Sequence, residues 1–466
     1  MHRTLRRELQ TFYARCEESG RDLPKFVRRE FDTFLGCGVL QYGFLRVRCQ
    51  DCGDDRLVAF SCKGRGFCPS CTGRRMADTA AHLVDRVLPH VPVRQWVLSL
   101  PIQIRPMLAY DAALSRAVLN IFLRVVFAWH RRKAKLLGIN GAQCGAVTSI
   151  QRFGSALNLN LHFHVLVLDG VFHQGGADAS PSFRALKAPS TKEIAELTRK
   201  IQTRVVRLFE RRGLFDDNRD VPDDEQALVG SYSASARGRI GFGENAGRLH
   251  QKLLSYAPTK PSKDKRAANI SGFDLHANVR VKAADRPKLE RLCRYILRPP
   301  LASTRLSETA DGKILFAMKR RFDDGTTHIV FEPLDFIEKL VALIPKPRAH
   351  QVLYHGVLAP HANWRSLVIL KPDDAKPAKG VGPTSTGAAR SPPELRQRRL
   401  TWAELMRRVF AVDVLKCHVC GGPRTILSAI TDPTVIRAIL GCLGLPTTAK
   451  RQHPPRAPPQ NELCFP

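Results

Sequence analysis

Cysteine pairs at metal-binding spacing stand near the start of this 466-residue sequence. The stretch "CQDCGDDRLVAFSCKGRGFCPSC" contains two C-x2-C pairs separated by fifteen residues: Cys49/Cys52 and Cys68/Cys71. Tetrahedral Zn²⁺ is commonly held by four thiolates from two such turns, and the neighbouring glycine and proline suit tight turns. We therefore expect these four cysteines to hold one structural zinc ion in a zinc ribbon over residues 46–75.

The remaining cysteines are harder to assign. Cys62 is left over, and we place it on a strand between the two pairs. Cys417 and Cys420 form half of another site, which no spacing completes; the candidates are Cys442, Cys464 and His418. We expect the single, scattered cysteines to be small core residues.

Two histidines interrupt an apolar run, "LNLNLHFHVLVLDG", at residues 157–170. Residues i and i+2 of a strand share a face, so His162 and His164 point the same way. Two imidazoles can chelate one ion and leave coordination positions open, which suits a catalytic Lewis acid. A hydrogen-bonded pair of core histidines is the alternative.

A tyrosine follows the last predicted strand, in "RLCRYILRPP". Attack by Tyr295 on a phosphodiester would form a covalent ester that keeps the bond energy for later rejoining. Relative to Tyr295, Arg291, Arg294 and Arg298 lie at i−4, i−1 and i+3. Arg291 and Arg298 share the helical face of the tyrosine and could clamp a phosphate. The alternative is a tyrosine packed in a core helix.

The charge of the chain points to a polyanionic partner. Lysine and arginine number 74 against 42 acidic residues, which gives a net charge of +32 and a pI near 10.2. Release of condensed counterions drives such a protein onto nucleic acid. Six basic residues around the cysteine block could contact DNA backbone or form a solvated rim: Arg46, Arg48, Lys63, Arg65, Arg74 and Arg75. We find no apolar run of transmembrane length and no signal peptide, so we expect a cytoplasmic protein without a membrane partner.

The predicted elements that position these residues alternate in type. Strands at 94–101, 142–154, 157–170 and 271–283 are interleaved with helices at 107–138 and 190–213. This β-α-β-β-α-β order predicts an α+β fold, a ferredoxin-like antiparallel sheet with helices on one face. The tyrosine helix follows it, capped by Asp285 and ended by two prolines.

Composition divides the chain into seven expected parts. They are a helical basic region (1–45), the zinc-binding domain (46–75), a catalytic domain (76–345), a segment associated with it (346–370), a flexible linker (371–398), a small basic C-terminal module (399–445) and a disordered tail (446–466). The linker and tail are assigned from their proline-rich composition.

Several stretches resemble one family of transposases. "HFHVLVLDG" resembles the motif of HUH endonucleases, in which two histidines flank a hydrophobic residue. The stretches "FSCKGRGFCPSC", "RFGSALNLNLHFHVLVLDGVF", "LCRYILRPPLASTRL" and "YHGVLAPHANWR" resemble the rolling-circle insertion-sequence transposases of the IS91 type. The resemblance spans about residues 25–440 in the same order.

This resemblance implies a DNA-nicking mechanism. Tyr295 would cleave one strand at an element end, leaving a 5′-phosphotyrosine and a free 3′-OH, and single-strand transfer with rolling-circle replication would follow. His162 and His164 would hold Mg²⁺ or Mn²⁺. The positions four residues before and after Tyr295 are Arg291 and Pro299, so the chain resembles a single-tyrosine variant of a family with two-tyrosine members.

A third metal ligand is also implied. His276, on the polar face of the strand before the tyrosine helix, is the first candidate, and the weaker ones are Asn160, Asp169 and Gln151. The expected partners are single-stranded DNA at element termini and targets and, because no phosphate-loop motif is present, host helicase and replication proteins. A rolling-circle replication initiator and a non-catalytic zinc-ribbon DNA-binding protein are the alternative functions.

Overall fold

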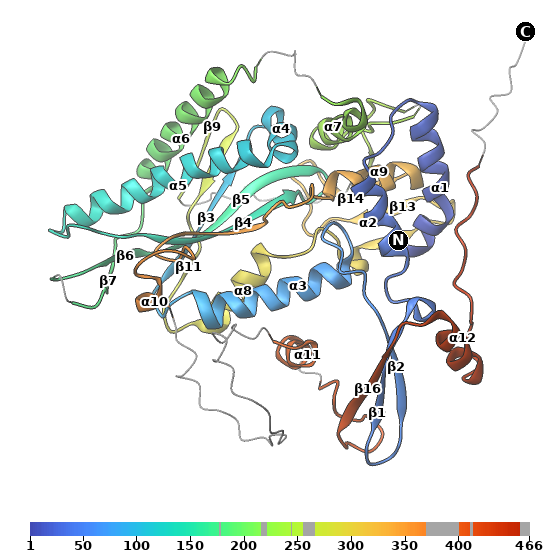
Figure 1. Ribbon diagram of the computed structural model, residues 1–466. Helices are drawn as coiled ribbons and strands as arrows, with labels where there is room; N and C mark the ends of the chain where they lie inside the picture. The colour runs from blue at the N-terminus through green and yellow to red at the C-terminus, as the bar shows by residue number, and fades with distance from the viewer. Residues whose placement is uncertain are drawn as a thin grey trace, which may run out of the picture.

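A large antiparallel sheet forms the centre of the protein (Figure 1). The computed structural model describes residues 1–176, 179–215, 221–243, 245–254, 266–369, 400–410 and 413–456. The sheet has seven strands in the order β15-β4-β5-β3-β10-β9, with β11 pairing with the other end of β3. These strands are β3 (Val93–Ser99), β4 (Gly145–Phe153), β5 (Leu159–Leu168), β9 (Ala267–Ile270), β10 (Phe273–His276), β11 (Arg280–Val281) and β15 (Val352–Gly356).

Helices cover both faces of this sheet, as Figure 1 shows. One face packs on α4 (Arg105–Tyr110), α5 (Ala112–Lys135) and α6 (Thr191–Arg211); the other packs on α3 (Pro69–His82), the short π-helix η2 (Leu83–Val87) and α8 (Arg286–Ile296). The two helices of the expected plan correspond to α5 and α6 and lie on one face as expected, whereas the cover of the opposite face was not expected. Near its centre the sheet is apolar on both sides. Leu98 and Phe163 face α5, and Val147 and Leu166 face α3 and α8. Two apolar faces require a layer of helices on each side.

Helix α5 is long and apolar enough to cross a membrane, which corrects the expectation that no apolar run reaches that length. Half of its most apolar 18-residue window is buried inside the protein. Its buried side chains, among them Val118, Phe122 and Trp129, contribute to the core above the sheet. This is the pattern of a core helix.

A second sheet and the N-terminal helices pack beside this centre. The sheet has the order β12-β13-β14-β8 and consists of β8 (Gln251–Leu254), β12 (Leu306–Glu308), β13 (Ile314–Ala317) and β14 (Thr326–Phe331). The helices around it are α1 (His2–Glu18), α2 (Lys25–Leu35), α7 (Asp223–Ala236) and α9 (Pro333–Leu343); β6 (Gly170–His173) and β7 (Ser182–Ala185) form a separate hairpin, and α10 (Arg365–Val368) follows β15.

A third sheet joins the two ends of the chain. Strands β1 (Phe44–Cys49) and β2 (Asp55–Ala59) form a hairpin, and β16 (Arg424–Ile430) pairs with β1 over its whole length. The C-terminal part is completed by α11 (Trp402–Phe410) and α12 (Pro433–Cys442). The C-terminal module expected at 399–445 is thus a structural extension of the N-terminal cysteine region.

The segment after α12 differs from the expected disordered tail over its described part. Residues 452–456 run along α1, where the backbone N–H of His453 donates to the carbonyl of Arg6 at 3.0 Å. The N–H of Arg456 donates to Thr11 Oγ1, also at 3.0 Å. The expected linker at 371–398 lies outside the described residues.

A buried ion pair fixes the end of the central strands. Arg94 on β3 forms two hydrogen bonds with the carboxylate of Asp169, at 2.8 and 3.0 Å, and both side chains are buried. Arg280 on β11 donates to the same carboxylate at 2.8 Å. Since two guanidinium groups hold Asp169, its carboxylate is not free to bind a metal.

We expect Asp169→Asn to lower the free energy of unfolding by about 3 kcal/mol, because it leaves Arg94 buried without its counter-charge. Urea denaturation followed by circular dichroism measures this change. Asp55→Asn, which removes the exposed partner of Arg46, is the matched control and should leave the midpoint unchanged. Equal midpoints for the two variants would contradict the role of the buried pair.

Candidate active site and zinc centres

The two histidines of β5 face each other on the side of the sheet covered by α8. His162 Nε2 and His164 Nε2 lie 3.1 Å apart, and both side chains are buried. The alternation along β5 sends Phe163 and Val165 to the opposite face, into the core under α5. The strand therefore presents two ring nitrogens at one point above the sheet.

Hydrogen bonds at the far nitrogens orient both rings. His162 Nδ1 lies 2.7 Å from the carbonyl of Asn160, and His164 Nδ1 lies 2.8 Å from Gln95 Nε2. Burial lowers the pKa of His162 to about 4 and that of His164 well below its usual value, and the positive charge of Arg298 acts in the same direction. Both imidazoles are thus neutral at pH 7, the state in which histidine binds metal ions.

Tyr295 lies directly over this pair. It comes from the last turn of α8, and its ring meets that of His164 at 5.9 Å between centroids and 78° between planes. The helix is held down by β4, where Ser149 and Gln151 donate to the carbonyl of Ile296 at 2.9 and 2.6 Å. Tyr295 itself is 42% exposed, so part of the residue is open to solvent.

Positive charges surround the tyrosine, but not as the helical spacing indicated. The guanidinium carbon of Arg298 lies 4.9 Å from the centre of the tyrosine ring, although α8 ends at Ile296 and Arg298 is beyond it. Arg291 is exposed on α8, whereas Arg294 pairs with Glu290 at 3.2 Å. Lys319 lies 5.3 Å from the ring centre, and nothing in the sequence around it distinguishes it from other lysines.

The structure does not bring His276 to the histidine pair. His276 on β10 pairs with Val97 on β3, and Val97 pairs with His164 on β5. His276 therefore points to the same face of the sheet as the two histidines but lies two strands, about 10 Å, away from them. Its Nε2 is 3.1 Å from a carboxylate oxygen of Asp274. Among the described residues, no third His, Cys, Asp or Glu ligand atom joins both His162 and His164 within 4.8 Å.

Two amide oxygens do lie on this face without partners. Gln151 is the cross-strand neighbour of His162, and Asn160 precedes His162 by two residues on the same strand. Gln151 Oε1 and Asn160 Oδ1 are both buried and have no hydrogen-bond partner in the described part of the chain. An unpaired buried oxygen is costly, and a bound cation would satisfy it.

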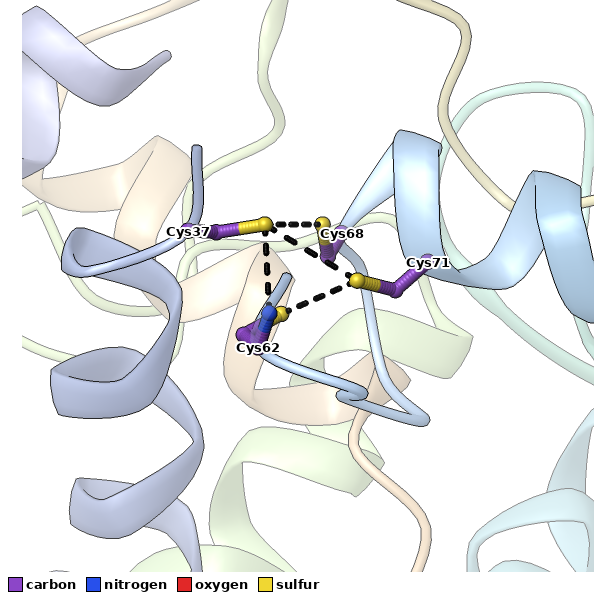
Figure 2. Close-up of side chains that lie close together, drawn as sticks. All are labelled: Cys37, Cys62, Cys68 and Cys71. Atoms are coloured by element: carbon purple, nitrogen blue, oxygen red, sulfur yellow. Dashed lines mark hydrogen bonds between the residues drawn. The ribbon is translucent and has the colours of Figure 1, made fainter. Parts of the chain in front are cut away.

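Four cysteines meet at the N-terminal end of α3 (Figure 2). Their sulfurs come from Cys37 after α2, Cys62 after β2, and Cys68 and Cys71 at the start of α3. Three of the Sγ separations are 3.7, 3.8 and 3.4 Å, close to the edge of about 3.8 Å expected for four thiolates around Zn²⁺. We call this group the first cysteine quartet.

The expected quartet of Cys49, Cys52, Cys68 and Cys71 is therefore corrected. Cys62, which the spacing leaves unassigned, and Cys37, which is expected to be a core residue, complete the site of Cys68 and Cys71. Cys49 and Cys52 lie instead within 4.8 Å of a pair from the other end of the chain, Cys417 and Cys420. We call this group the second cysteine quartet.

A signal in the sequence separates the two kinds of pair. "CQDCG" and "CHVCG" each place a glycine directly after the second cysteine, and Gly53 and Gly421 have φ angles of 73° and 80°, where a side chain is unfavourable. "CPSCT" has no such glycine, because Cys71 already lies in helix α3. The shared glycine relates Cys49/Cys52 to Cys417/Cys420.

A basic groove leads from Cys71 of the first quartet to Arg298, the neighbour of the tyrosine. It lies between the cysteine loop with α3 and strand β15, and the larger of its two adjoining cavities has a volume of about 620 Å³. Arg65 and Arg75 line both cavities, and Gln151 and Arg298 line the inner one. Lys63 and Arg74 add to the charge of the outer one, which also contains Asp78.

Comparisons with known proteins agree with this arrangement. Residues 145–365 match the Y2_Tnp family of transposases, and residues 6–100 match the transposase zinc-binding domain of the IS91 type. The transposase for insertion sequence element IS801 from Pseudomonas savastanoi pv. phaseolicola is 22% identical over 414 residues, which cover 86% of this chain and 83% of that relative. No solved structure gave a significant match.

A zinc-binding domain followed by a transposase domain defines a zinc-containing insertion-sequence transposase. The two matches and this relative together support an IS91-family transposase. The resemblance noted in the sequence is thereby confirmed, and a DNA-acting transposase is favoured over the replication initiator and the non-catalytic DNA-binding protein.

We expect Cys62→Ser to lose one equivalent of zinc per chain and to lower thermal stability, because it removes one of the four thiolates in the first quartet. Metal analysis of the purified protein measures the loss. Cys144→Ser changes a buried cysteine that lies outside both quartets and should keep the full zinc content. A Cys62→Ser protein with unchanged zinc would show that this cysteine is not a ligand.

Proposed function

We propose that this transposase cleaves one DNA strand by attack of the Tyr295 hydroxyl on a phosphodiester at the element end. The Oη–P bond forms, the P–O3′ bond breaks, and the departing 3′ oxygen takes up a proton. The products are a 5′-phosphotyrosine and a free 3′-OH. Attack of a 3′-OH on the phosphotyrosine reverses the chemistry on another strand and completes strand transfer.

The observation that carries this proposal is the placement of Tyr295 against His164. A nucleophile must lie beside the group that stabilises charge on the phosphate, and the near-perpendicular rings at 5.9 Å place it there. Arg298, which has a cation–π contact with the tyrosine ring, is positioned to bind a phosphate oxygen. A tyrosine that only packed in a core would not be 42% exposed.

The histidine pair fits a divalent cation. Two ligands at neighbouring corners of an octahedron stand about 3 Å apart, close to the 3.1 Å between the two Nε2 atoms. Mg²⁺ or Mn²⁺ held there would polarise the phosphodiester, and the imidazole ligands suit Mn²⁺ better. Without a metal, the two Nε2 atoms at this distance must share a hydrogen bond, so one of them must carry a proton.

Gln95 decides which nitrogen of His164 carries the proton. When its amide nitrogen donates to Nδ1, the proton of His164 must sit on Nε2, where it blocks metal binding. A rotation of the amide by 180° presents the carbonyl oxygen instead, moves the proton to Nδ1 and frees Nε2. Gln95 is therefore a positioning residue for the metal ligand.

Gln151 is the best third ligand in place of His276. Its buried Oε1 lacks a partner, and its position opposite His162 places it beside the pair. Its amide nitrogen, bonded to the Ile296 carbonyl, fixes the side chain next to the helix that carries Tyr295. Asn160, with a second unpartnered oxygen, is the next candidate.

The sheet supports an HUH-type core. Strands β10-β3-β5-β4 follow the spatial order of the ferredoxin-like plan, with antiparallel neighbours throughout, and β9 and β15 extend it on either side.

The basic groove supports a path for single-stranded DNA from the first quartet to Tyr295. In the described part of the chain Tyr295 is the one tyrosine in ring contact with the pair, so we propose one covalent bond per chain in each step.

We expect single-stranded oligonucleotides from the element termini to form a covalent adduct with the protein when Mn²⁺ is added, and Tyr295→Phe to abolish it. Denaturing electrophoresis of labelled DNA detects the adduct. Tyr42→Phe changes a tyrosine that is 61% exposed and remote from the site, and it should leave the yield unchanged. An adduct that survives in Tyr295→Phe would refute the assignment of the nucleophile.

We expect Gln151→Ala to weaken Mn²⁺ binding at least about tenfold, because it removes a ligand. Calorimetric titration of the zinc-loaded protein measures the affinity. His276→Ala is the matched variant on the same face and should bind Mn²⁺ with unchanged affinity. Weaker Mn²⁺ binding by His276→Ala, with unchanged binding by Gln151→Ala, would instead make His276 the ligand and Gln151 a support for α8.

A further inference from the structure

We propose that the second cysteine quartet, Cys49, Cys52, Cys417 and Cys420, is a second structural zinc centre that joins the two ends of the chain. The family match to the zinc-binding domain ends at residue 100 and that to the transposase ends at residue 365. Half of this site therefore lies beyond both matched regions. The inference concerns the architecture and does not depend on the tyrosine mechanism.

The sulfur geometry suits one tetrahedral ion. Cys49 Sγ lies 3.5 Å from Cys420 Sγ, and Cys52 Sγ lies 3.7 Å from Cys417 Sγ. All four atoms are within 4.8 Å of one another, and thiolates around zinc stand about 3.8 Å apart. Four sulfurs fill the coordination sphere, so the site is closed and structural.

Each cysteine pair is built as a metal-binding turn. In the first turn the N–H of Gly53 donates to the carbonyl of Cys49 at 3.2 Å, and in the second the N–H of Gly421 donates to Cys417 at 2.9 Å. The N–H of Gly422 also points at Cys420 Sγ at 3.4 Å. Backbone donors of this kind stabilise a thiolate.

The two turns pack face to face with no room for added atoms. A Cβ on Gly422 would come within 2.1 Å of an Asp51 carboxylate oxygen, so a larger residue there would require the Asp51 side chain to move. Next to them the N–H of Gln50 donates to the carbonyl of Pro423 at 3.0 Å, and Cys49 pairs with Arg424 across β1 and β16. The register of β16 on β1 thus brings the second turn opposite the first.

A positive side chain offsets the charge of the site. Four thiolates and Zn²⁺ carry a net charge of −2, and the Arg424 guanidinium lies 3.6 Å from Cys417 Sγ. The same side chain bonds His418 Nδ1 at 2.8 Å, which turns that imidazole toward Arg424. His418, a candidate ligand in the sequence, is thus a neighbour of the quartet rather than a member.

The small core around this sheet explains why a metal is needed. Its fully buried apolar residues are Phe44, Ile436 and Leu440, and most of β16 is exposed, with Ile426 58% and Leu427 50% accessible. So small a core rarely holds a fold without a metal or disulfide staple. Helix α11 is attached separately: Arg408 pairs with Glu290 on α8 at 2.8 Å and also with Asp85. Leu405 packs against Ala77 and Ala81 of α3.

The test is the zinc content of the full-length protein. We expect two zinc ions per chain in the unmodified protein and one in Cys417→Ser/Cys420→Ser. Cys49→Ser/Cys52→Ser and the variant with all four changes should also retain one, because both pairs share the same ion. Cys442→Ser, in the same C-terminal part but outside both quartets, is the control and should retain two. One zinc ion in the unmodified protein, or two in Cys417→Ser/Cys420→Ser, would overturn the proposal.

A measurement on the unmodified protein covers variants that fail to fold. Zinc K-edge absorption should give an average of four sulfur ligands at about 2.3 Å, as two all-cysteine sites require. Oxygen or nitrogen in the average shell would overturn the second site.

A specific protease sequence placed within residues 371–398 allows the connection between the two ends of the chain to be measured. After cleavage the C-terminal fragment should remain bound to the rest of the protein, and about tenfold more of it should dissociate in Cys417→Ser/Cys420→Ser.

Discussion

The register of β5 in the central sheet is the constraint on which the proposed catalytic arrangement depends. His162 and His164 meet only because they occupy alternate positions on one strand, with Ser99 and Val97 opposite them on β3 and Gln151 and Ser149 on β4. A slip of one residue would turn both imidazoles into the core under α5 and would turn Phe163 toward the tyrosine. Pairing on both sides and the apolar residues Phe163 and Val165 hold the strand in place.

Local patterns predicted much of this arrangement. Alternation along β5 placed the histidines on one face, and the capped helix after β10 placed Tyr295 on a rigid element, where the side chain of Asp285 accepts from Lys288 as expected. The order of strands and helices followed from the same periodicities. These features depend on neighbours in the sequence, which is why they could be predicted without a structure.

Contacts between distant residues could not be predicted in the same way. The grouping of cysteines depends on which segments meet in space, and proximity in sequence favoured pairing Cys49 and Cys52 with the wrong partners. Cys37 and Lys319 carry no local signal, since a single cysteine or lysine is ordinary anywhere. Strands β15 and β16 are short additions to sheet edges whose partners lie about 200 and 380 residues earlier, and no periodicity reveals such pairing.

The pairing of β1 with β16 has a consequence for synthesis of the chain. A ribosome releases β1 and β2 early, but the strand that covers the outer edge of β1 emerges only after residue 430. Until then a newly made chain carries an open strand edge, which invites pairing with other molecules. Closing so long a loop costs only about 5 kcal/mol, since that entropy grows with the logarithm of length. A chain cut short before β16 would keep the residues that we propose to nick DNA and would leave this edge exposed, so premature termination yields a molecule prone to aggregate.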